Sequence, residues 1–240
     1  MVIELDISSN VQCVKGIGPV RAKLLSKLGI TSIEDALWYF PRDYLDLSPL
    51  NFKQGKAEKI GAFPCIVTGP CNNKKAKSGI YVTKLPVTDG RNRGYAVFFN
   101  QPFISKTLYK GDRLLLIGRI KKAAGEYELS NPQWIKFQRG RPIEIDRISP
   151  VYSLTKGLSQ KVMRQIMREM LGSSRVLEEV LPQELIEKYN LMPVEETVRN
   201  LHFPKSYDSL QRAQNRIIFE ELLIFQLALG FSRQQIISEK

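Results

Sequence analysis

The stretch Tyr-Ala-Val-Phe-Phe-Asn-Gln-Pro-Phe, residues 95–103, decides how the middle of this 240-residue chain folds. Alternate side chains of residues 95–99 fall on opposite faces of a strand, and both faces are apolar. The proline suits the first turn of a helix, which we predict to run to about Tyr109. Phe99 and Phe103 flank the corner between strand and helix, where a ring can point outward instead of into a core.

Strand patterns on both sides of this stretch predict a small β-barrel between residues 58 and 135. The expected order is three strands, the helix and two further strands, at 60–68, 80–88, 95–99, 102–109, 113–122 and 126–130. The polar, basic residues Asn72–Gly79 are expected to form a hairpin loop between the first two strands. This is the element order of an OB-fold, a five-stranded barrel that commonly binds oligonucleotides.

Two short helices around a glycine-containing turn are predicted for residues 14–40. The first follows Gly16-Ile17-Gly18-Pro19 and ends at Gly29, and the second begins at Thr31, with Glu34 completing a capping box. The pattern resembles a helix-hairpin-helix unit, in which backbone N–H groups at the turn can bind a phosphate. A packing unit in which glycine lets two helices approach closely is the alternative, and the pattern does not decide between them.

Apolar residues at helical spacing predict that the last part of the chain is α-helical. The expected helices begin at Ser159, at about Leu181 and Pro193, and near Ser206, after a proline-marked linker. The last helix is apolar on more than one side, so it must be covered by something. The expected fold class is α+β, with an N-terminal helical hairpin at 1–50, a central five-stranded OB-fold β-barrel at 51–140, and a linker with an α-helical connector at 141–240.

The positive charge of the chain is concentrated in the predicted barrel. The whole chain has a formal net charge of +12. Residues 51–141 contain 18 Lys and Arg against 5 Asp and Glu, whereas the rest of the chain contains 18 against 19. A basic surface confined to one segment favours a polyanionic partner such as nucleic acid. A merely solubilising surface is the plainer alternative.

The sequence offers few metal ligands and no catalytic constellation. The cysteines and the single histidine are widely scattered, so no metal site is expected: Cys13, Cys65, Cys71 and His202. There is no GxxxxGK[ST] phosphate loop, HExxH motif or nucleophile elbow, so no catalytic residue is expected. His202 is flanked by Leu201 and Phe203, which favours a hydrogen-bonded structural histidine over a base.

Compartment and membrane association follow from the same composition. No apolar run approaches the roughly 20 residues that span a bilayer. The N-terminus lacks the basic start of a signal peptide. We therefore expect a cytoplasmic protein without a membrane partner.

Five segments together resemble the N-terminal wedge region of the RecG branched-DNA helicases. They occur in the family's order and spread over nearly the whole chain: Val14–Pro19 with Leu37–Arg42, Phe98–Pro102, Pro150–Gln160, Leu201–Pro204 and Phe219–Leu223. No single segment is decisive, but the set is specific. The resemblance implies that residues 51–140 are the wedge domain, which sits at a DNA fork and splits its arms.

The same resemblance implies an ATP-dependent DNA helicase, a hydrolase acting at replication forks and junctions in DNA repair and recombination. Its motor, two ATPase lobes that use ATP and Mg²⁺, would be absent from these 240 residues. The expected partners are branched or forked DNA and the motor domains of the same polypeptide. A monomer is expected. The apolar sides of the last helix would then be covered by the motor.

The resemblance assigns base stacking to Phe99 and Phe103, at a corner that also contains Asn100 and Gln101. The family commonly has tyrosine at the second position, so Phe103 keeps the ring and lacks the hydroxyl. Basic residues are expected to attract phosphates without reading sequence, namely Lys74, Lys75, Lys77, Arg91, Arg93, Lys121 and Lys122. Phe98 is expected in the barrel core.

Other functions stay open on the sequence alone. An OB-fold can bind a protein, and the helical half would then be a docking platform for that partner. The same barrel can bind RNA, although nothing in the sequence specifically reads a 2′-hydroxyl. A preference for forked over linear DNA would separate the wedge from a protein-interaction module.

Overall fold

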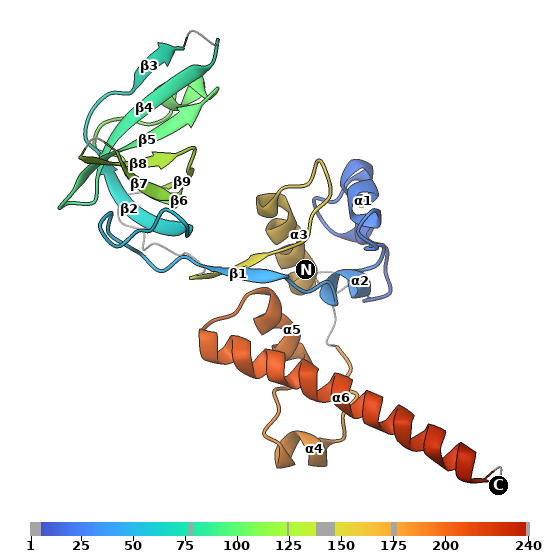
Figure 1. Ribbon diagram of the computed structural model, residues 1–240. Coiled ribbons are helices and arrows are strands. Elements are labelled where there is room, and N and C mark those ends of the chain that lie inside the picture. The colour runs from blue at the N-terminus through green and yellow to red at the C-terminus, as the bar shows by residue number, and fades with distance from the viewer. Residues whose placement is uncertain (1–5, 77–78, 124, 138–146, 174–176, 239–240) are drawn as a thin grey trace. The chain divides into compact units, whose positions relative to one another are not determined.

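The computed structural model describes residues 6–76, 79–123, 125–137, 147–173 and 177–238 (Figure 1). Lys77, one of the predicted phosphate contacts, lies outside these residues. The chain forms two compact units, one of Met1–Tyr44 with Ile148–Lys240 and one of Leu45–Arg147. The first unit is mainly helical and the second is a β-sheet, so the α+β class is confirmed. The sequence segments 1–50 and 141–240 thus contribute mainly to one unit.

Most of the helices belong to the first unit. They are the short 3₁₀ helix η1 (Val11–Cys13) and the α-helices α1 (Pro19–Ser26), α2 (Ile33–Leu37), α3 (Gln160–Ser173), α4 (Gln183–Lys188), α5 (Val194–His202) and α6 (Tyr207–Ser238). Strand β1 (Asp43–Asp46) pairs with strand β10 (Ile148–Val151) as a two-stranded sheet. The positions expected for the helices from the apolar spacing agree with these bounds to within a few residues.

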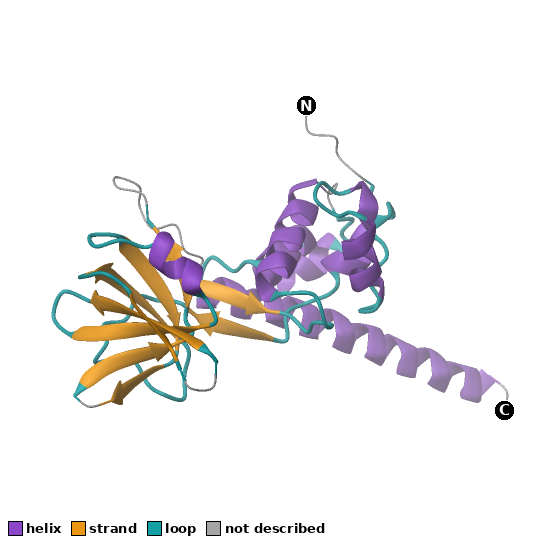
Figure 2. Ribbon diagram, turned by 90° about the horizontal axis from the view of Figure 1, so that it is seen from above, coloured by secondary structure: helices purple, strands orange, loops and turns teal. Residues whose placement is uncertain are grey.

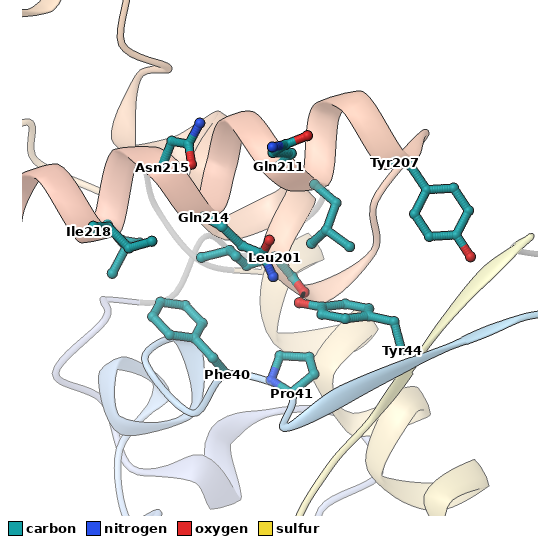
Figure 3. A pocket seen from close by; sticks show the side chains of 11 residues that line it. Phe40, Pro41, Tyr44, Leu201, Tyr207, Gln211, Gln214, Asn215 and Ile218 are labelled. Carbon is teal, nitrogen blue, oxygen red and sulfur yellow. Dashed lines mark hydrogen bonds between the residues drawn. The ribbon is translucent and has the colours of Figure 1, made fainter.

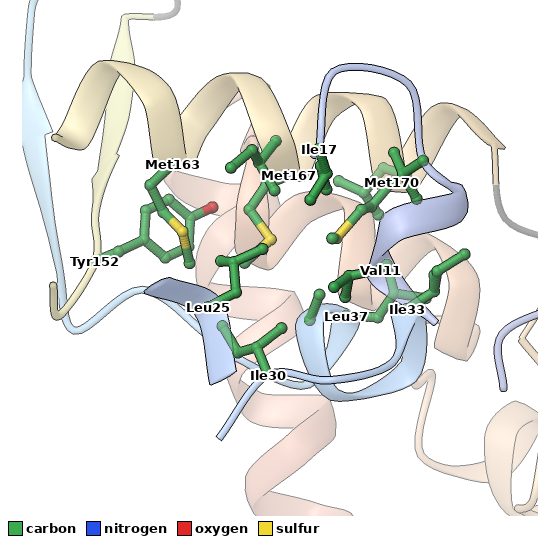
Figure 4. Close-up of a cluster of buried hydrophobic side chains, with 14 of the residues drawn as sticks. Val11, Ile17, Leu25, Ile30, Ile33, Leu37, Tyr152, Met163, Met167 and Met170 are labelled. Carbon is green, nitrogen blue, oxygen red and sulfur yellow. The ribbon is translucent and has the colours of Figure 1, made fainter. Parts of the chain in front are cut away.

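The core of this unit joins residues that are far apart in the sequence. Met163, Met167 and Met170 project from one side of α3, as their spacing of four and three residues predicts. They are buried in one cluster with Leu25 of α1 and Leu37 of α2 (Figure 4). Burial of this shared apolar face explains why the first and last segments of the chain fold together.

The capping box of α2 is one residue later than predicted. Ser32, not Thr31, is the N-cap, and its hydroxyl oxygen accepts a hydrogen bond from the backbone N–H of Asp35 at 3.0 Å. The carboxylate of Asp35 in turn accepts from the N–H groups of Ser32 and Thr31. These bonds favour the charged carboxylate and hold the pKa of Asp35 well below its usual range. Glu34 does not take part.

His202 has the structural role expected from the sequence. Its side chain is buried and lies between two hydrogen-bond partners. Nε2 lies 2.9 Å from the carbonyl oxygen of Leu37, to which it must donate, so Nδ1 accepts from the hydroxyl of Tyr152 at 3.0 Å. Burial disfavours the charged ring and lowers the pKa of His202 to about 4. The ring is therefore neutral near pH 7.

The second unit is one sheet of eight strands (Figure 2). Its elements are β2 (Gly61–Val67), β3 (Asn72–Lys75), β4 (Tyr81–Thr88), β5 (Arg93–Phe99), the 3₁₀ helix η2 (Pro102–Lys106), β6 (Arg113–Gly118), β7 (Ile120–Ala123), β8 (Glu126–Ser130) and β9 (Gln133–Lys136). The strand order is β7-β8-β5-β4-β2-β6-β9, and β3 pairs with β4. Only β5 and β8 run parallel to each other among the pairs whose register is described.

The predicted count of five strands is too low, for three local reasons. Residues Asn72–Lys75 form strand β3 instead of a loop, and β9 was not predicted. The single strand expected at 113–122 is interrupted at Arg119, so it appears as β6 and β7.

The helix expected to reach Tyr109 is the shorter η2, which ends at Lys106. The sheet encloses an apolar core in which Phe63, Phe98 and Leu114 are fully buried.

Candidate nucleic-acid interface

The corner after β5 is fixed to the start of β4 by Asn100. Asn100 has a φ of +53°, in the left-handed region that asparagine tolerates better than most residues. Its backbone N–H donates to the carbonyl oxygen of Tyr81 at 2.8 Å. Its side-chain oxygen Oδ1 accepts from the backbone N–H of Tyr81 at 3.2 Å. Two hydrogen bonds to one residue hold the chain direction at the point where the strand ends.

Gln101 fixes the other side of the corner. Its side-chain Nε2 donates to Oδ1 of Asn131 at 2.7 Å. Asn131 follows β8, and its backbone N–H donates to the carbonyl oxygen of Val97 at 2.6 Å. The side chains predicted to bind nucleic acid at positions 100 and 101 are thus engaged within the protein. This arrangement gives them a positioning role, and direct contact with DNA stays a prediction.

The two rings assigned to base stacking are exposed. Phe99 is 43% exposed and Phe103 is 52% exposed, whereas the neighbouring Phe98 is fully buried. Phe98 faces the core because adjacent residues of a strand point to opposite sides of the sheet. Phe103 lies in η2, which is anchored through the buried side chain of Ile104. The expectation that Phe98 is core, while Phe99 and Phe103 are exposed, is confirmed.

Lysines lie beside Phe99 on the same face of the sheet. Val82 of β4 pairs with Phe99 of β5 on one side and with Lys74 of β3 on the other. Two residues further along β4, Lys84 pairs with Val97. Residues paired directly across strands share a face, so Lys74, Phe99 and Lys84 belong to one basic, aromatic face. Lys84 was not predicted, because its place near Phe99 depends on the register between β4 and β5, which a local sequence pattern does not contain.

The remaining predicted cations lie further from the corner. Arg93 pairs with Thr88 at the opposite end of the β4–β5 hairpin, and Arg91 is in the turn beyond it. Six residues of strand separate Arg93 from Phe99, about 20 Å at 3.3 Å per residue. Lys121 and Lys122 are on β7, which reaches β5 only through β8. The structure therefore brings Lys74 and Lys75 to the corner and leaves these four cations elsewhere on the sheet unit.

The β7 lysines are also partly engaged within the protein. The Nζ of Lys121 lies 3.2 Å from a carboxylate oxygen of Glu128. The Nζ of Lys122 lies 6.0 Å from the ring centre of Tyr127. Both interactions are weak enough at a surface to give way to a phosphate. Lys84 makes a contact of the same kind, with its Nζ 5.6 Å from the ring centre of Tyr95, so position relative to the corner is what distinguishes it from the β7 lysines.

The helical unit contains a groove of a different character. It has a volume of about 690 Å³ and lies between residues Phe40–Tyr44 and the first turns of α6 (Figure 3). Phe40 and Leu201 line its apolar side, and the carboxamides of Gln211, Gln214 and Asn215 lie along α6. The hydroxyl of Tyr44 donates to the carbonyl oxygen of Leu201 at 2.5 Å. The groove residues supply no cation for a phosphate within the part of the chain that the structure describes.

Two further properties concern the same described residues. Their helices are too short or too polar to cross a bilayer. Their His, Cys, Asp and Glu side chains form no group of three that could hold a metal ion.

A mixed α+β chain with a basic sheet unit is the class that these features define. The chain belongs to the RecG wedge domain family, because the model of that family matches residues 10–174. The resemblance read from the five sequence segments is thereby confirmed.

Individual relatives agree with this assignment. The ATP-dependent DNA helicase RecG of Thermotoga maritima is 35% identical over 240 residues, which cover 97% of this chain and 30% of the relative. The enzyme of the same name from Staphylococcus aureus strain MSSA476 is 29% identical over 227 residues, which cover 90% of this chain and 32% of the relative. A solved structure of RecG bound to a three-way DNA junction is 33% identical, with a TM-score of 0.81 over 97% of this chain and 32% of that chain. The chain spans about a third of the length of these relatives.

Proposed function

We propose that this chain is the part of an ATP-dependent DNA helicase that binds branched or forked DNA and splits its duplex arms. The single observation that carries the proposal is the corner after β5, where Phe99 and Phe103 are exposed on a backbone held by hydrogen bonds. A RecG relative with a TM-score of 0.81 was solved on a three-way DNA junction, which supports a branched substrate here. Exposed rings and cations together are typical of surfaces that bind single-stranded nucleic acid.

The strand pairings support the interpretation of the sheet as an OB-fold barrel. β2 pairs with β4, β4 with β5, β5 with β8, and β8 with β7. β7 follows β6 after one residue, Arg119, and β6 pairs back with β2. If β6 and β7 are counted as one interrupted strand, these pairings form a ring of five strands. We infer that β3 and β9 are additions to an OB-fold.

The mechanism follows from the positions of charges and rings. Lys74 and Lys84 attract the phosphates and so hold a strand across β3, β4 and β5 without reading its sequence. Bases exposed at the branch point stack on Phe99 and Phe103, each contributing about 1–3 kcal/mol. Opening one base-pair step costs on average about 1.4 kcal/mol of stacking. Two rings therefore offset the loss of roughly one to a few steps, and the energy for continued opening would come from ATP and Mg²⁺ bound outside these residues.

Helix α6 favours a protein partner in addition to DNA. Seven apolar side chains of this helix are at least 39% exposed: Ile218, Leu222, Ile224, Phe225, Leu227, Leu229 and Phe231. They lie on more than one side of the helix, which is unusual for a helix surrounded by water. We propose that motor domains of the same polypeptide cover this part of α6. The alternative, a separate protein-interaction module, would use the same surface.

Binding of fluorescent DNA to the 240-residue chain tests the wedge proposal. The anisotropy of a labelled fork and of a linear duplex of equal length is measured with the wild type and with Phe99→Leu/Phe103→Leu. We expect the wild type to prefer the fork, and the double variant to lose at least about tenfold in fork affinity because two stacking contacts are removed. Tyr189→Leu, which removes an exposed ring of the helical unit, is the control. Equal binding of both DNAs by the wild type would refute the proposal.

A further inference from the structure

Tyr81, the first residue of β4, lies at the same corner as Phe99 and Phe103. It is 44% exposed, and both of its backbone polar groups are bonded to Asn100. The Nζ of Lys75 lies 5.5 Å from the centre of its ring. A ring on a backbone fixed in this way needs little ordering to receive a ligand, which favours binding.

Tyr81 and Phe99 lie on opposite faces of the β3–β4–β5 sheet. Tyr81 pairs with Lys75, whereas the next residue of β4, Val82, pairs with Lys74 and Phe99. Thr83, two residues after Tyr81, is buried on the core-facing side. Tyr81 therefore continues the core-facing row beyond the end of the core, where it is exposed. Each face of this end of the sheet thus presents an aromatic ring beside at least one lysine.

We propose that Tyr81 and Lys75 form a third nucleotide site at the corner, a site for one unpaired nucleotide at the branch of the DNA. This inference rests on the proposed function and adds a residue that the resemblance did not assign. The base stacks on the ring of Tyr81, and the phosphodiester binds the ammonium group of Lys75. A charge-assisted bond to phosphate is stronger than an exposed contact between a lysine and a ring, so Lys75 can leave the ring.

Tyr189 provides an internal comparison. It is also an exposed tyrosine, at 50%, and the Nζ of Lys188 lies 5.3 Å from its ring centre. It is the C-cap of α4 and belongs to the helical unit, so it is no part of the corner between β4, β5 and η2. Tyr189 therefore combines a ring and a lysine as Tyr81 does, but in the other unit of the chain.

Fork binding by tyrosine variants tests this site. We expect Tyr81→Leu to bind the fork at least about fivefold more weakly than the wild type, because one stacked base is lost. Tyr81→Phe keeps the ring and should bind within about twofold of the wild type. Tyr189→Leu should bind like the wild type. Circular dichroism, and the fluorescence of Trp134 in a Trp38→Phe background, check that each variant folds.

Photochemical cross-linking gives a readout that does not depend on affinity. Forks carrying 5-iodouracil at each unpaired position next to the branch are irradiated with the wild type, and the adducts are mapped by mass spectrometry. We expect an adduct at Tyr81 and none at Tyr189. Wild-type affinity in Tyr81→Leu, an equal loss in Tyr81→Phe, or a fork that yields adducts elsewhere but not at Tyr81 would overturn the site.

The two proposals fail in different ways. If the wild type does not prefer the fork, the wedge function itself is refuted. If the fork preference is present and depends on Phe99 and Phe103, while Tyr81→Leu retains it, only the third nucleotide site is refuted.

Discussion

Substitution of Asn100 tests how the corner is built. The residue contributes a side-chain hydrogen bond to the N–H of Tyr81 and occupies a φ of +53°. Asn100→Gly removes the hydrogen bond but adopts the left-handed conformation without strain. Asn100→Ala removes the same bond and must also place a Cβ atom in that conformation. The backbone bond from residue 100 to the carbonyl of Tyr81 is available to both variants.

The expected magnitudes follow from these two contributions. Loss of the hydrogen bond costs about 1 kcal/mol of unfolding free energy, because the site is exposed and water can replace the partner. The left-handed backbone costs roughly a further 1 kcal/mol or more for alanine. We therefore expect a loss of about 1 kcal/mol for Asn100→Gly and about 2 kcal/mol for Asn100→Ala. This order is the reverse of the usual preference for alanine over glycine in ordered elements.

Denaturation in urea, followed by tryptophan fluorescence, measures this difference in the sheet unit. Trp134 packs against the core of that unit, and Trp38 belongs to the helical unit. A Trp38→Phe background therefore leaves Trp134 as the reporter. The reasoning is refuted if Asn100→Ala is as stable as Asn100→Gly or more stable.

Three other predictions concern the pH dependence, the buried charge and the basic face. The unfolding free energy should fall by about 3 kcal/mol between pH 6.5 and pH 4 through His202. The reason is that the unfolded ring binds a proton near pH 6.5, whereas the folded ring binds one only near pH 4. If the wild type and His202→Gln lose stability in parallel as the pH falls, this prediction is wrong. Arg216→Leu should cost about 3 kcal/mol or more in thermal or urea unfolding, because its fully buried guanidinium pairs with Glu179 at 2.7 Å. Arg199→Leu, in an exposed pair, should change stability by less than about 1 kcal/mol, and equal effects would argue against this account. Lys84→Gln should reduce the slope of log Kd for the fork against log salt concentration by about 1, and an unchanged slope would remove Lys84 from the phosphate contacts.

The sequence predicted the corner well because several local signals agree there. Apolar residues on both faces of 95–99, the break at Asn100 and the proline at position 102 all indicate a strand that ends in a turn. The exposure of Phe99 and Phe103 followed from the idea that a ring at such a corner can point outward. Their stacking on bases stays a prediction.

Elements held by pairing with distant strands were missed. Asn72–Lys75 is polar and exposed, so it has no apolar alternation. It forms β3 because it pairs with the edge that β4 offers. Lys84 and Tyr81 were missed because their neighbours are also set by pairing between strands. Their place beside Phe99 and Lys75 depends on the register between strands, which local sequence patterns do not contain.

Long-range packing was also beyond local patterns. The methionines of α3 were correctly expected in a core stripe, but the spacing does not identify α1 and α2 as their partners. The capping box of α2 shows a finer limit. Thr31 with Glu34 and Ser32 with Asp35 both have the required three-residue spacing, and only the backbone geometry of the helix start selects the second pair.

Fluorine NMR of the chain labelled with fluorophenylalanine tests the central claim most directly. The signals of Phe99, Phe103 and the buried Phe98 are assigned by single substitutions to leucine, and the chain is titrated with a fork and with a linear duplex. We predict that the Phe99 and Phe103 signals shift with the fork, because a stacked base changes their ring environment, and that the Phe98 signal does not. If the fork binds and the signals of Phe99 and Phe103 stay unchanged, these rings do not stack on DNA and the account of the wedge is wrong.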